Sequence, residues 1–574
     1  MKKVIYFAFL LIASSTLLRA QEKAFTHADT LRGTITPERA WWDVLRYDIW
    51  VKPDYASKTI QGCVTIEYKV VSNGKKMQID LQQPLIVDSV FENYSVSSKK
   101  NYVDVIYISY RRKSIHFERQ GNVAFLDITE KDVPKAGFPT SITIYYHGTP
   151  REAVRPPWDG GWIWTKDSLG RPWMTVACQG LGASVWYPCK DHQSDEPDNG
   201  ASLSIVVADS LVAVGNGRMT SKVDNHDGTT TWKWEVKDPI NNYNLIPYIG
   251  KYAGWTDTYN GEKGKLDVFY WALDYNKARA KVQFKQSLNM LKAFEHWFGP
   301  YPFYEDGYKL IEAPHLGMEH QTAVAYGNKY QNGYLGRDLS GTGWGLKWDF
   351  IIVHESGHEW FANNITSKDL ADMWIHEGIT NFSETLFTDY WFGKDAGNAY
   401  NYGTRKRIKN DKPIIAHYGV NEEGSGDMYY KGGNMMNLIR HSIDDDSLFR
   451  QIMRGLNKTF YHQTVTTQQV ENYISNHSRI DFSKVFDQYL RTTQIPVLEY
   501  YYSADNGTFN YRFTNCVQGF NLRIAVNDGS NKYKIPASEK WAKTAIKKGR
   551  DASALPSLID KNYYITLKEV QPPQ

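Results

Sequence analysis

The N-terminal part of the chain is dominated by short segments in which hydrophobic and polar residues alternate. Examples are 60–71, 141–146 and 203–207, with Gly, Pro and Asn between them. Alternation with a period of two is typical of strands that bury one face. Residues 225–231 contain Asn, Asp and Gly ahead of another apolar run, which predicts a hairpin turn. We therefore predict an all-β domain over residues 21–252, in which residues 21–40 form an extended leader.

The pattern changes after Lys251, where helical spacing of apolar residues becomes common. The predicted elements are a strand at 266–272, a helix at 275–297, an edge strand at 309–322 broken at Pro314 and Gly317, and helices over most of 396–490. This mixture predicts an α/β domain over residues 253–494. Strands return in residues 495–574, where Asn506-Gly507 between two apolar runs favours a hairpin. The whole chain is thus predicted to be a multi-domain α+β protein with a small C-terminal β-rich domain.

One predicted helix carries two histidines four residues apart. Apolar residues from Phe350 to Phe361 indicate a buried helix, and it contains His354-Glu355-Ser356-Gly357-His358. Positions four apart share a helix face, so both imidazoles can point to one metal ion. Glu377, on a second predicted helix, can supply a third ligand. A catalytic zinc site has three protein ligands and one open position, and the Glu of this motif serves as its general base.

The alternative is a solvent-exposed helix face with two histidines and no metal. That reading leaves unexplained why Glu377 follows at this distance, within Trp374-Ile375-His376-Glu377-Gly378. We therefore predict one Zn²⁺ per chain, with His354, His358 and Glu377 as ligands and Glu355 as the base. Two histidines and a carboxylate suit zinc, although cobalt or manganese can substitute in vitro.

Composition narrows the class of protein further. The net charge of +4 is small for 574 residues, and no basic stripe indicates nucleic-acid binding. The four cysteines include no Cys-x-x-Cys pair, so the metal ligands are not thiolates and the chain is not a disulfide scaffold. Cys178 and Cys189 can either form a disulfide or remain free buried thiols.

The first twenty residues have the features of a secretory signal. Lys2 and Lys3 precede an apolar run over 4–18, and Leu18-Arg19-Ala20 is a suitable cleavage site. A retained signal anchor is the alternative. No other stretch is apolar for long enough to span a membrane. We expect a protein that is exported to the periplasm or secreted and keeps no stable membrane span after cleavage of residues 1–20.

The metal-ligand segment resembles a known family, the aminopeptidase N and leukotriene hydrolase family of zinc metallopeptidases. The segment HESGHEWFANNIT is similar to the family's HELxHxWFGNxVT, and DMWIHEG is similar to DLWLNEG. The resemblance covers nearly the whole chain after the signal and implies a thermolysin-like catalytic domain. Ala362 stands where the family usually has Gly, and His376 where it usually has Asn. Many members also have a large C-terminal helical domain that is missing here.

The resemblance also implies substrate-binding and catalytic residues outside the metal segment. Leu316-Gly317-Met318-Glu319-His320 is similar to the family's Gly-x-Met-Glu-Asn strand, in which the Glu binds the α-amino group of the substrate. Tyr429-Tyr430-Lys431-Gly432 matches Tyr-x-Lys-Gly, whose first Tyr stabilises the oxyanion. The loop before Trp186 matches the family's amine-binding loop and places Gln179 at its Glu or Gln position. These matches imply Gly317, Met318, Glu319 and Gln179 as substrate-binding residues and Tyr429 as a catalytic residue.

The combined reading is an exported zinc aminopeptidase that acts on peptides with a free N-terminus. A thermolysin-like endopeptidase is one rival, but it has no need for an amine anchor such as Glu319. A homologue that binds peptides without cleaving them is another rival, and the intact set of catalytic residues argues against it. Gln179 resembles the leukotriene hydrolase branch, which leaves epoxide hydrolysis beside peptidase activity open. His376, His320 and His315 lie near the motifs, and we predict structural roles for them.

Overall fold

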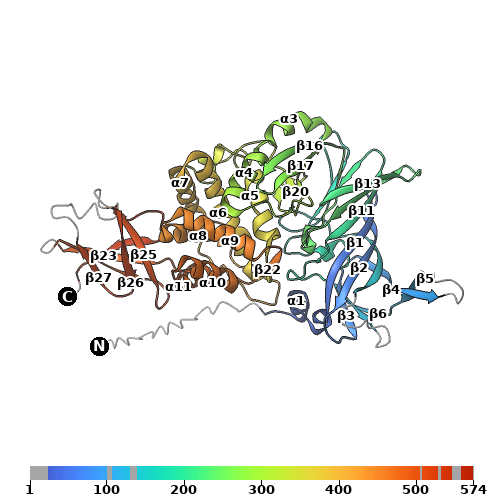
Figure 1. The fold of residues 1–574 in the computed structure, drawn as a ribbon, viewed down its shortest axis with the longest axis horizontal. Helices are drawn as coiled ribbons and strands as arrows, with labels where there is room; N and C mark the ends of the chain where they lie inside the picture. Colours follow the sequence, from blue (N-terminus) through green and yellow to red (C-terminus); the bar gives the residue numbers. More distant parts are fainter. Residues whose placement is uncertain are drawn as a thin grey trace, which may run out of the picture.

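The computed structural model describes residues 24–99, 106–128, 139–503, 507–527, 532–545 and 558–572. The predicted signal peptide lies outside these residues. The N-terminal sheets and the C-terminal strands occupy opposite ends of an elongated molecule, with the helices between them (Figure 1). The predicted fold class, multi-domain α+β, is confirmed. In the part of the chain described, no helix combines the length and the apolar character needed to cross a membrane.

The N-terminal region contains three antiparallel or mixed sheets among the described residues. The largest has the order β13-β14-β11-β1-β2-β8-β4-β5, and the smaller ones have the orders β12-β15-β10-β9 and β3-β7-β6. The strands are β1 (Trp42–Asp54), β2 (Thr59–Val70), β3 (Lys76–Asp80), β4 (Ile86–Lys99), β5 (Ile106–Ser114), β6 (Phe117–Gln120), β7 (Val123–Asp127), β8 (Pro139–Gly148), β9 (Gly161–Lys166), β10 (Pro172–Ala177), β11 (Ala201–Ala208), β12 (Val212–Val214), β13 (Arg218–Asp224), β14 (Thr229–Val236) and β15 (Tyr248–Gly250). The predicted strands at 60–71, 141–146 and 203–207 are confirmed, as is the hairpin between β13 and β14.

The extended leader predicted over residues 21–40 is wrong for its described part. Residues 27–40 contain two short helices, α1 (His27–Gly33) and α2 (Pro37–Ala40). Helix α1 begins with a capping box, in which the Thr26 hydroxyl accepts from the Asp29 backbone and the Asp29 carboxylate accepts from the Thr26 backbone. Pro37 lies at the start of α2, where its missing N–H costs no hydrogen bond. Both start signals are readable in the sequence.

A five-stranded sheet connects the N-terminal region to the helices, with the order β16-β17-β18-β20-β19. Its strands are β16 (Tyr252–Gly261), β17 (Gly264–Leu273), β18 (Tyr308–Glu312), β19 (Gly317–Met318) and β20 (Val324–Tyr326). Neighbouring side chains on β18 point to opposite faces. Leu310 packs in the core shared with the helices, and Ile311 packs in the core of the N-terminal region. This sheet therefore lies between two hydrophobic cores.

The edge strand predicted over residues 309–322 is only partly correct. Strand β18 is internal, because it pairs in parallel with β17 on one side and with β20 on the other. The edge is formed by β19, which begins at Gly317 after the break at Pro314. Proline and glycine marked the break correctly, but the partners of β18 come from segments outside that stretch.

The helices between and after the strands of this sheet form the middle part of the molecule (Figure 1). They are α3 (Lys277–Gln283), α4 (Gln286–Phe298), α5 (Phe350–Gly357), α6 (Trp374–Phe392), α7 (Lys394–Thr404), α8 (Tyr430–Ile443), α9 (Asp446–Thr459), α10 (Thr467–Ser478) and α11 (Ser483–Arg491). A short parallel pair, β21 (Ile365–Ser367) and β22 (Gln463–Val465), lies among them. The single helix predicted over 275–297 is wrong, because this stretch forms two helices, α3 and α4. Helix α4 ends at Phe298, and Gly299 follows it with a φ of 93° that favours glycine, as the predicted stop signal implies.

The C-terminal region is β-rich, as predicted. It contains β23 (Val497–Ser503), β24 (Thr508–Thr514), β25 (Asn521–Asn527), β26 (Lys532–Ser538), β27 (Ala542–Ala545) and β28 (Thr566–Glu569). Strands β23 and β24 form the hairpin predicted at Asn506-Gly507, although Asn506 itself lies outside the described residues. Buried residues of these strands, including Leu498 and Phe513, belong to the same hydrophobic cluster as the helices. The domain boundaries proposed at residues 252 and 494 stay predictions.

Candidate active site

Helix α5 carries the two histidines, and Asp349 fixes where the helix begins. The Asp349 carboxylate accepts hydrogen bonds from the backbone N–H groups of Ile351 and Ile352. The helix ends at Gly357, but His358 keeps helical dihedral angles, with φ −64° and ψ −19°. The helix predicted to reach Phe361 therefore stops early, and the chain turns through Phe361 and Ala362 instead. His354 and His358 still lie on one face.

Both histidines are held by their Nδ1 atoms, so that Nε2 points into the site. Nδ1 of His354 lies 2.8 Å from Oε1 of Glu384, and Nδ1 of His358 lies 3.0 Å from the carbonyl oxygen of Phe361. A carboxylate and a carbonyl oxygen can only accept, so each Nδ1 carries a hydrogen, and in the neutral imidazole each Nε2 presents a lone pair. This tautomer is the one that a metal ion requires.

Glu377 completes a cluster of three buried metal-ligating groups. Its Oε2 lies 3.6 Å from Nε2 of His354 and 3.4 Å from Nε2 of His358. These three residues form one of two groups in the described chain that could hold a metal ion, and the other group is Glu319, Glu355 and His358. Oε2 of Glu377 is buried and has no hydrogen-bond partner among the described residues. A tetrahedral zinc ion with bonds of ~2.05 Å separates its ligand atoms by ~3.3 Å, so the donor set and its spacing fit zinc.

Glu355 lines the same cavity as the three candidate ligands. Burial raises the pKa of its carboxyl group to about 7. Strand β19 passes so close that a Cβ atom on Gly317 would lie 2.7 Å from Oε1 of Glu355. Gly317 therefore brings the backbone of β19 against the predicted base. A pKa near the working pH suits a group that both accepts and releases a proton.

The predicted amine anchor is assembled from three separate segments. Oε1 of Glu319 accepts a hydrogen bond of 2.5 Å from Nε2 of Gln179 and one of 2.9 Å from the hydroxyl of Tyr243. Asn363 holds the backbone at this point by donating to the carbonyl oxygen of Glu319. Burial raises the pKa of the Glu319 carboxyl group. The structure thus brings Glu319 and Gln179 together, as predicted, and adds Tyr243.

The structure separates the environments of the two neighbouring tyrosines. The ring of Tyr429 lies nearly parallel to that of His354, with 6.0 Å between centroids and 24° between planes. Tyr429 lines the cavity that contains the candidate metal ligands. Tyr430 lines the same cavity, but its ring lies beside Arg407, whose guanidinium carbon is 5.8 Å from the ring centroid. Tyr429 therefore has the position that an oxyanion donor needs.

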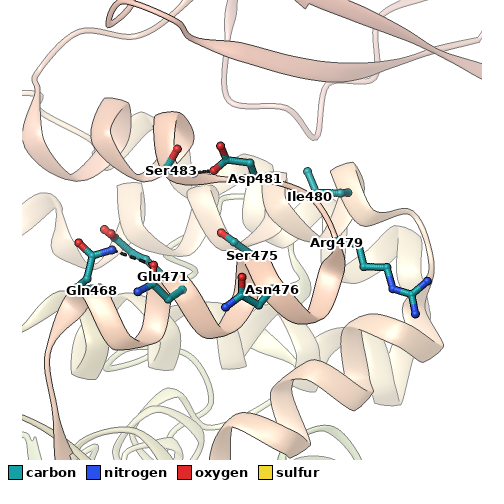
Figure 2. Close-up of a pocket in the computed structure, with 9 residues that line it drawn as sticks. Gln468, Glu471, Ser475, Asn476, Arg479, Ile480, Asp481 and Ser483 are labelled. Carbon is teal, nitrogen blue, oxygen red and sulfur yellow. Dashed lines mark hydrogen bonds between the residues drawn. The ribbon is translucent and has the colours of Figure 1, made fainter.

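These residues line one cavity with a volume of about 340 Å³. Its walls contain all nine predicted site residues: Gln179, Gly317, Met318, Glu319, His354, Glu355, His358, Glu377 and Tyr429. A second pocket of about 360 Å³ lies between α10 and the start of α11 (Figure 2). It is lined by polar side chains such as Gln468 and Asn476, and Arg479 points away from the others. That pocket contains none of the groups singled out from the sequence.

The histidines that we expected to be structural are buried. Nε2 of His376 accepts a hydrogen bond of 2.8 Å from the backbone N–H of Ser367. His320 contacts the hydroxyl of Tyr248, and burial lowers the pKa of His315 to about 4. All four cysteines are free, so Cys178 and Cys189 do not form a disulfide in this structure.

Two important residues were missed from the sequence. Glu384 lies seven positions after Glu377 on α6, which places both on one helix face. That spacing could have identified it as a partner for a histidine ligand. Tyr243 lies in a short turn, Asn242–Asn244, with no motif around it, and the sequence offers no signal for its contact with Glu319.

Comparison with known proteins finds a matching family and several relatives. Residues 283–489 match the model of the Peptidase family M1 domain. Endoplasmic reticulum aminopeptidase 1 of Homo sapiens is 22% identical over 344 residues, which are 57% of this chain and 35% of that protein. Probable aminopeptidase 1 of Sulfurisphaera tokodaii is 21% identical over 511 residues, or 86% of this chain and 58% of that protein. The chain thus spans from about a third to less than two thirds of these relatives.

The fold is shared with a solved structure. A mutant M1 zinc metallopeptidase of Deinococcus radiodurans, bound to a Tyr-Ser-Ala substrate, superposes with a TM-score of 0.65 and 18% identity. The match covers 80% of this chain and 96% of that one. The matched family segment contains both helices that bear the candidate metal ligands. The resemblance seen in the motifs is therefore confirmed, and residues 283–489 match the M1 family of zinc metallopeptidases.

Proposed function

We propose that this protein is a zinc aminopeptidase that removes single residues from the N-terminus of peptides. The observation that carries the proposal is the position of Glu319. Its carboxylate lies in the same cavity as His354, His358 and Glu377, and within 4.8 Å of ligating atoms of Glu355 and His358. A negative charge this close to the reacting centre would place the first peptide bond of a substrate there.

The amine anchor is suited to a charged α-amino group. Such a group has a pKa of ~7.7–8.0, so much of it is an ammonium ion at neutral pH. Gln179 and Tyr243 both donate to Oε1 of Glu319, which leaves Oε2 available to the ammonium ion. An acetylated N-terminus has neither the charge nor the donors, so it would leave a buried carboxylate without a partner.

The chain's own residues have distinct roles in the proposed reaction. Zinc, when bound by His354, His358 and Glu377, supplies Lewis acidity. Glu355 takes a proton from the attacking water and later gives it to the leaving amine. The Tyr429 hydroxyl donates a hydrogen bond to the developing oxyanion, which is typically worth about 2.7–4 kcal/mol.

The proposal is tested by comparing free and N-acetylated amino-acid amides as substrates. Wild-type protein and Glu355→Gln are assayed, and bound zinc is measured in both. We expect cleavage of the free amides only, and a loss of about 10²–10⁴-fold in Glu355→Gln with zinc retained. Equal cleavage of acetylated amides would overturn the anchoring role of Glu319 and point to an endopeptidase. No cleavage by zinc-loaded protein would point to a binding homologue.

Export is a second part of the proposal. It rests on the charged start and apolar run of residues 1–20. Mass spectrometry of the N-terminus, on protein from cell fractions of its native host, should find a chain that begins at Gln21 in the periplasm or the medium. A chain that retains Met1 in the membrane fraction would indicate a signal anchor instead.

A further inference from the structure

The catalytic cavity contains one acidic residue that the proposed reaction does not use. Four glutamates line this cavity: Glu319, Glu355, Glu377 and Glu423. No lysine or arginine is among its lining residues. The first three have roles as amine anchor, base and metal ligand. Glu423 has no such role, although it lines the same cavity.

Glu423 lies against the loop that carries Gln179. Gly180, with a φ of 71°, leaves room for it, because a Cβ atom there would lie 2.8 Å from Oε1 of Glu423. Nδ2 of Asn421 donates a hydrogen bond of 3.0 Å to the carbonyl oxygen of Gly180, which ties the two loops together. The Glu423 carboxylate therefore lies beside the amine-binding loop.

The carboxylate of Glu423 lacks a partner of its own. No hydrogen bond or ion pair joins it to any described side chain, and Glu423 is partly open to solvent and lines the cavity. Lys412 approaches from outside, but its Nζ donates to the backbone carbonyl oxygen of Glu423 at 3.3 Å. A carboxylate that has no lysine or arginine among the residues lining its cavity favours a cationic ligand.

We propose that Glu423 binds the positively charged side chain of a substrate whose first residue is Arg or Lys. This inference rests on the proposed aminopeptidase function. There the α-ammonium ion is bound by Glu319, so the next positive charge on a first residue is its side chain. Glu423 lies in the same cavity but makes no hydrogen bond with Gln179, Glu319 or Tyr243. It is therefore a specificity residue and takes no part in the chemical step.

The test compares substrates that differ in charge but not in shape. Arginine amide and citrulline amide have side chains of the same length and outline, and only the first is charged. Leucine amide is the apolar reference. In wild-type protein we expect kcat/KM for arginine amide to exceed that for citrulline amide by about tenfold. In Glu423→Gln this ratio should fall to about one, while kcat/KM for leucine amide is unchanged.

Glu422→Gln is the matched control. Glu422 is the preceding residue, and its carboxylate faces His417, with 2.7 Å between Oε2 and Nδ1. This variant removes the same charge from the same loop, so it should keep the arginine preference. Loss of the preference in both variants would mean that the loop's net charge matters, and it would overturn a specific role for Glu423.

Other outcomes separate this inference from the proposed function. If wild-type protein cleaves leucine amide but does not prefer arginine over citrulline, the inference is wrong and the aminopeptidase function stands. Equal losses for all three amides in zinc-loaded Glu423→Gln would instead assign Glu423 to the α-ammonium ion. Calorimetry on Glu355→Gln measures the binding of arginine amide and of citrulline amide, and so tests the same preference without turnover. Cleavage of acetylated amides would overturn the proposed function itself.

Discussion

Glu384 influences the candidate metal centre without being one of its ligands. Its Oε1 holds Nδ1 of His354, and its Oε2 accepts a hydrogen bond of 2.6 Å from the hydroxyl of Tyr400. The carboxylate fixes the orientation of the imidazole and increases the basicity of Nε2. The affinity for zinc therefore depends on a residue two helical turns beyond Glu377.

Replacing Glu384 should weaken zinc binding. We expect Glu384→Ala to lower zinc affinity by about 10–100-fold, because His354 loses its orienting acceptor. Tyr400→Phe removes only the next hydrogen bond and should have a smaller effect. Competition with a fluorescent chelator measures both. An unchanged affinity in Glu384→Ala would contradict the orienting role.

Ala362 has a backbone conformation that favours glycine. Its φ is 146° and its ψ is −43°, in the turn that follows His358. Such conformations cost a non-glycine residue about 1–3 kcal/mol. Glycine loses more chain entropy on folding, by about 0.5–1 kcal/mol. The family usually has Gly at this position, and the dihedral angles supply a physical reason for that preference.

We therefore expect Ala362→Gly to stabilise the protein by about 1 kcal/mol, the difference between these two effects. Ala396→Gly, in helix α7, is the control and should destabilise it by a similar amount. Thermal unfolding of the two variants beside the wild type should show midpoints that move in opposite directions. A lower midpoint for Ala362→Gly would show that alanine causes no backbone strain at this position.

At the scale of elements, local sequence patterns predicted the strands and helix starts that depend on interactions between neighbouring residues. The alternation over residues 60–71 and the capping signals around α1 depend on neighbours within a few positions, and both can be read directly. The internal position of β18 cannot, because β17 and β20 pair with it from other parts of the chain. The same distinction applies to the site.

Motif spacing predicted the candidate ligands, because His354 and His358 are adjacent on one helix face. It did not reveal Tyr243, which reaches Glu319 from 76 residues away in sequence. It also gave Glu423 no role, because only the folded structure shows that this carboxylate lines the cavity without a side-chain partner. A local sequence pattern shows neither contacts between distant residues nor the lack of a partner for a side chain.

Helices α6 and α8 approach each other closely at two glycines. A Cβ atom on Gly432 would lie 2.9 Å from the Cα of Gly378. Gly378 follows Glu377, and Gly432 lies on the first turn of α8, after Tyr429. The contact between these helices therefore sets the distance between a candidate metal ligand and the predicted oxyanion donor.

A methyl group at this contact should force the helices apart. Gly432→Ala gains about 1 kcal/mol in helix propensity, but overpacking against backbone costs about 1–3 kcal/mol. We expect a lower unfolding temperature and a lower kcat. Gly426→Ala is the control, because a Cβ atom there has no neighbour within 4 Å. Equal activities in the two variants would show that helices α6 and α8 accommodate the added methyl group without changing the distance between Glu377 and Tyr429.

At the scale of the whole molecule, the C-terminal strands are part of the core of the helices. Leu498, Phe513 and Ile524 belong to the cluster that contains Ile352 and Phe382. The guanidinium group of Arg405 also donates to backbone carbonyl oxygens of residues 561–563. The C-terminal region therefore stabilises the helical region directly.

Removing the C-terminal strands should expose a large apolar surface. We expect a chain that ends at residue 494 to be insoluble or to unfold at a much lower temperature than the full chain, because buried apolar area is lost. Soluble yield and thermal unfolding measure the effect. A truncated protein with an unchanged unfolding temperature would show that the helical region is stable alone.

The five-stranded sheet between the two cores has a consequence for how selectivity arises. The candidate metal ligands come from α5 and α6, whereas Gln179 and Tyr243 reach Glu319 from the N-terminal region. The candidate metal centre belongs to the helical region. The proposed binding site for the α-amino group of a peptide is completed by residues of the N-terminal region. A chain whose N-terminal region has not yet docked could bind metal, but it could not distinguish the end of a peptide from its middle. The proposed exopeptidase selectivity would therefore require the N-terminal region to be docked against the helical region.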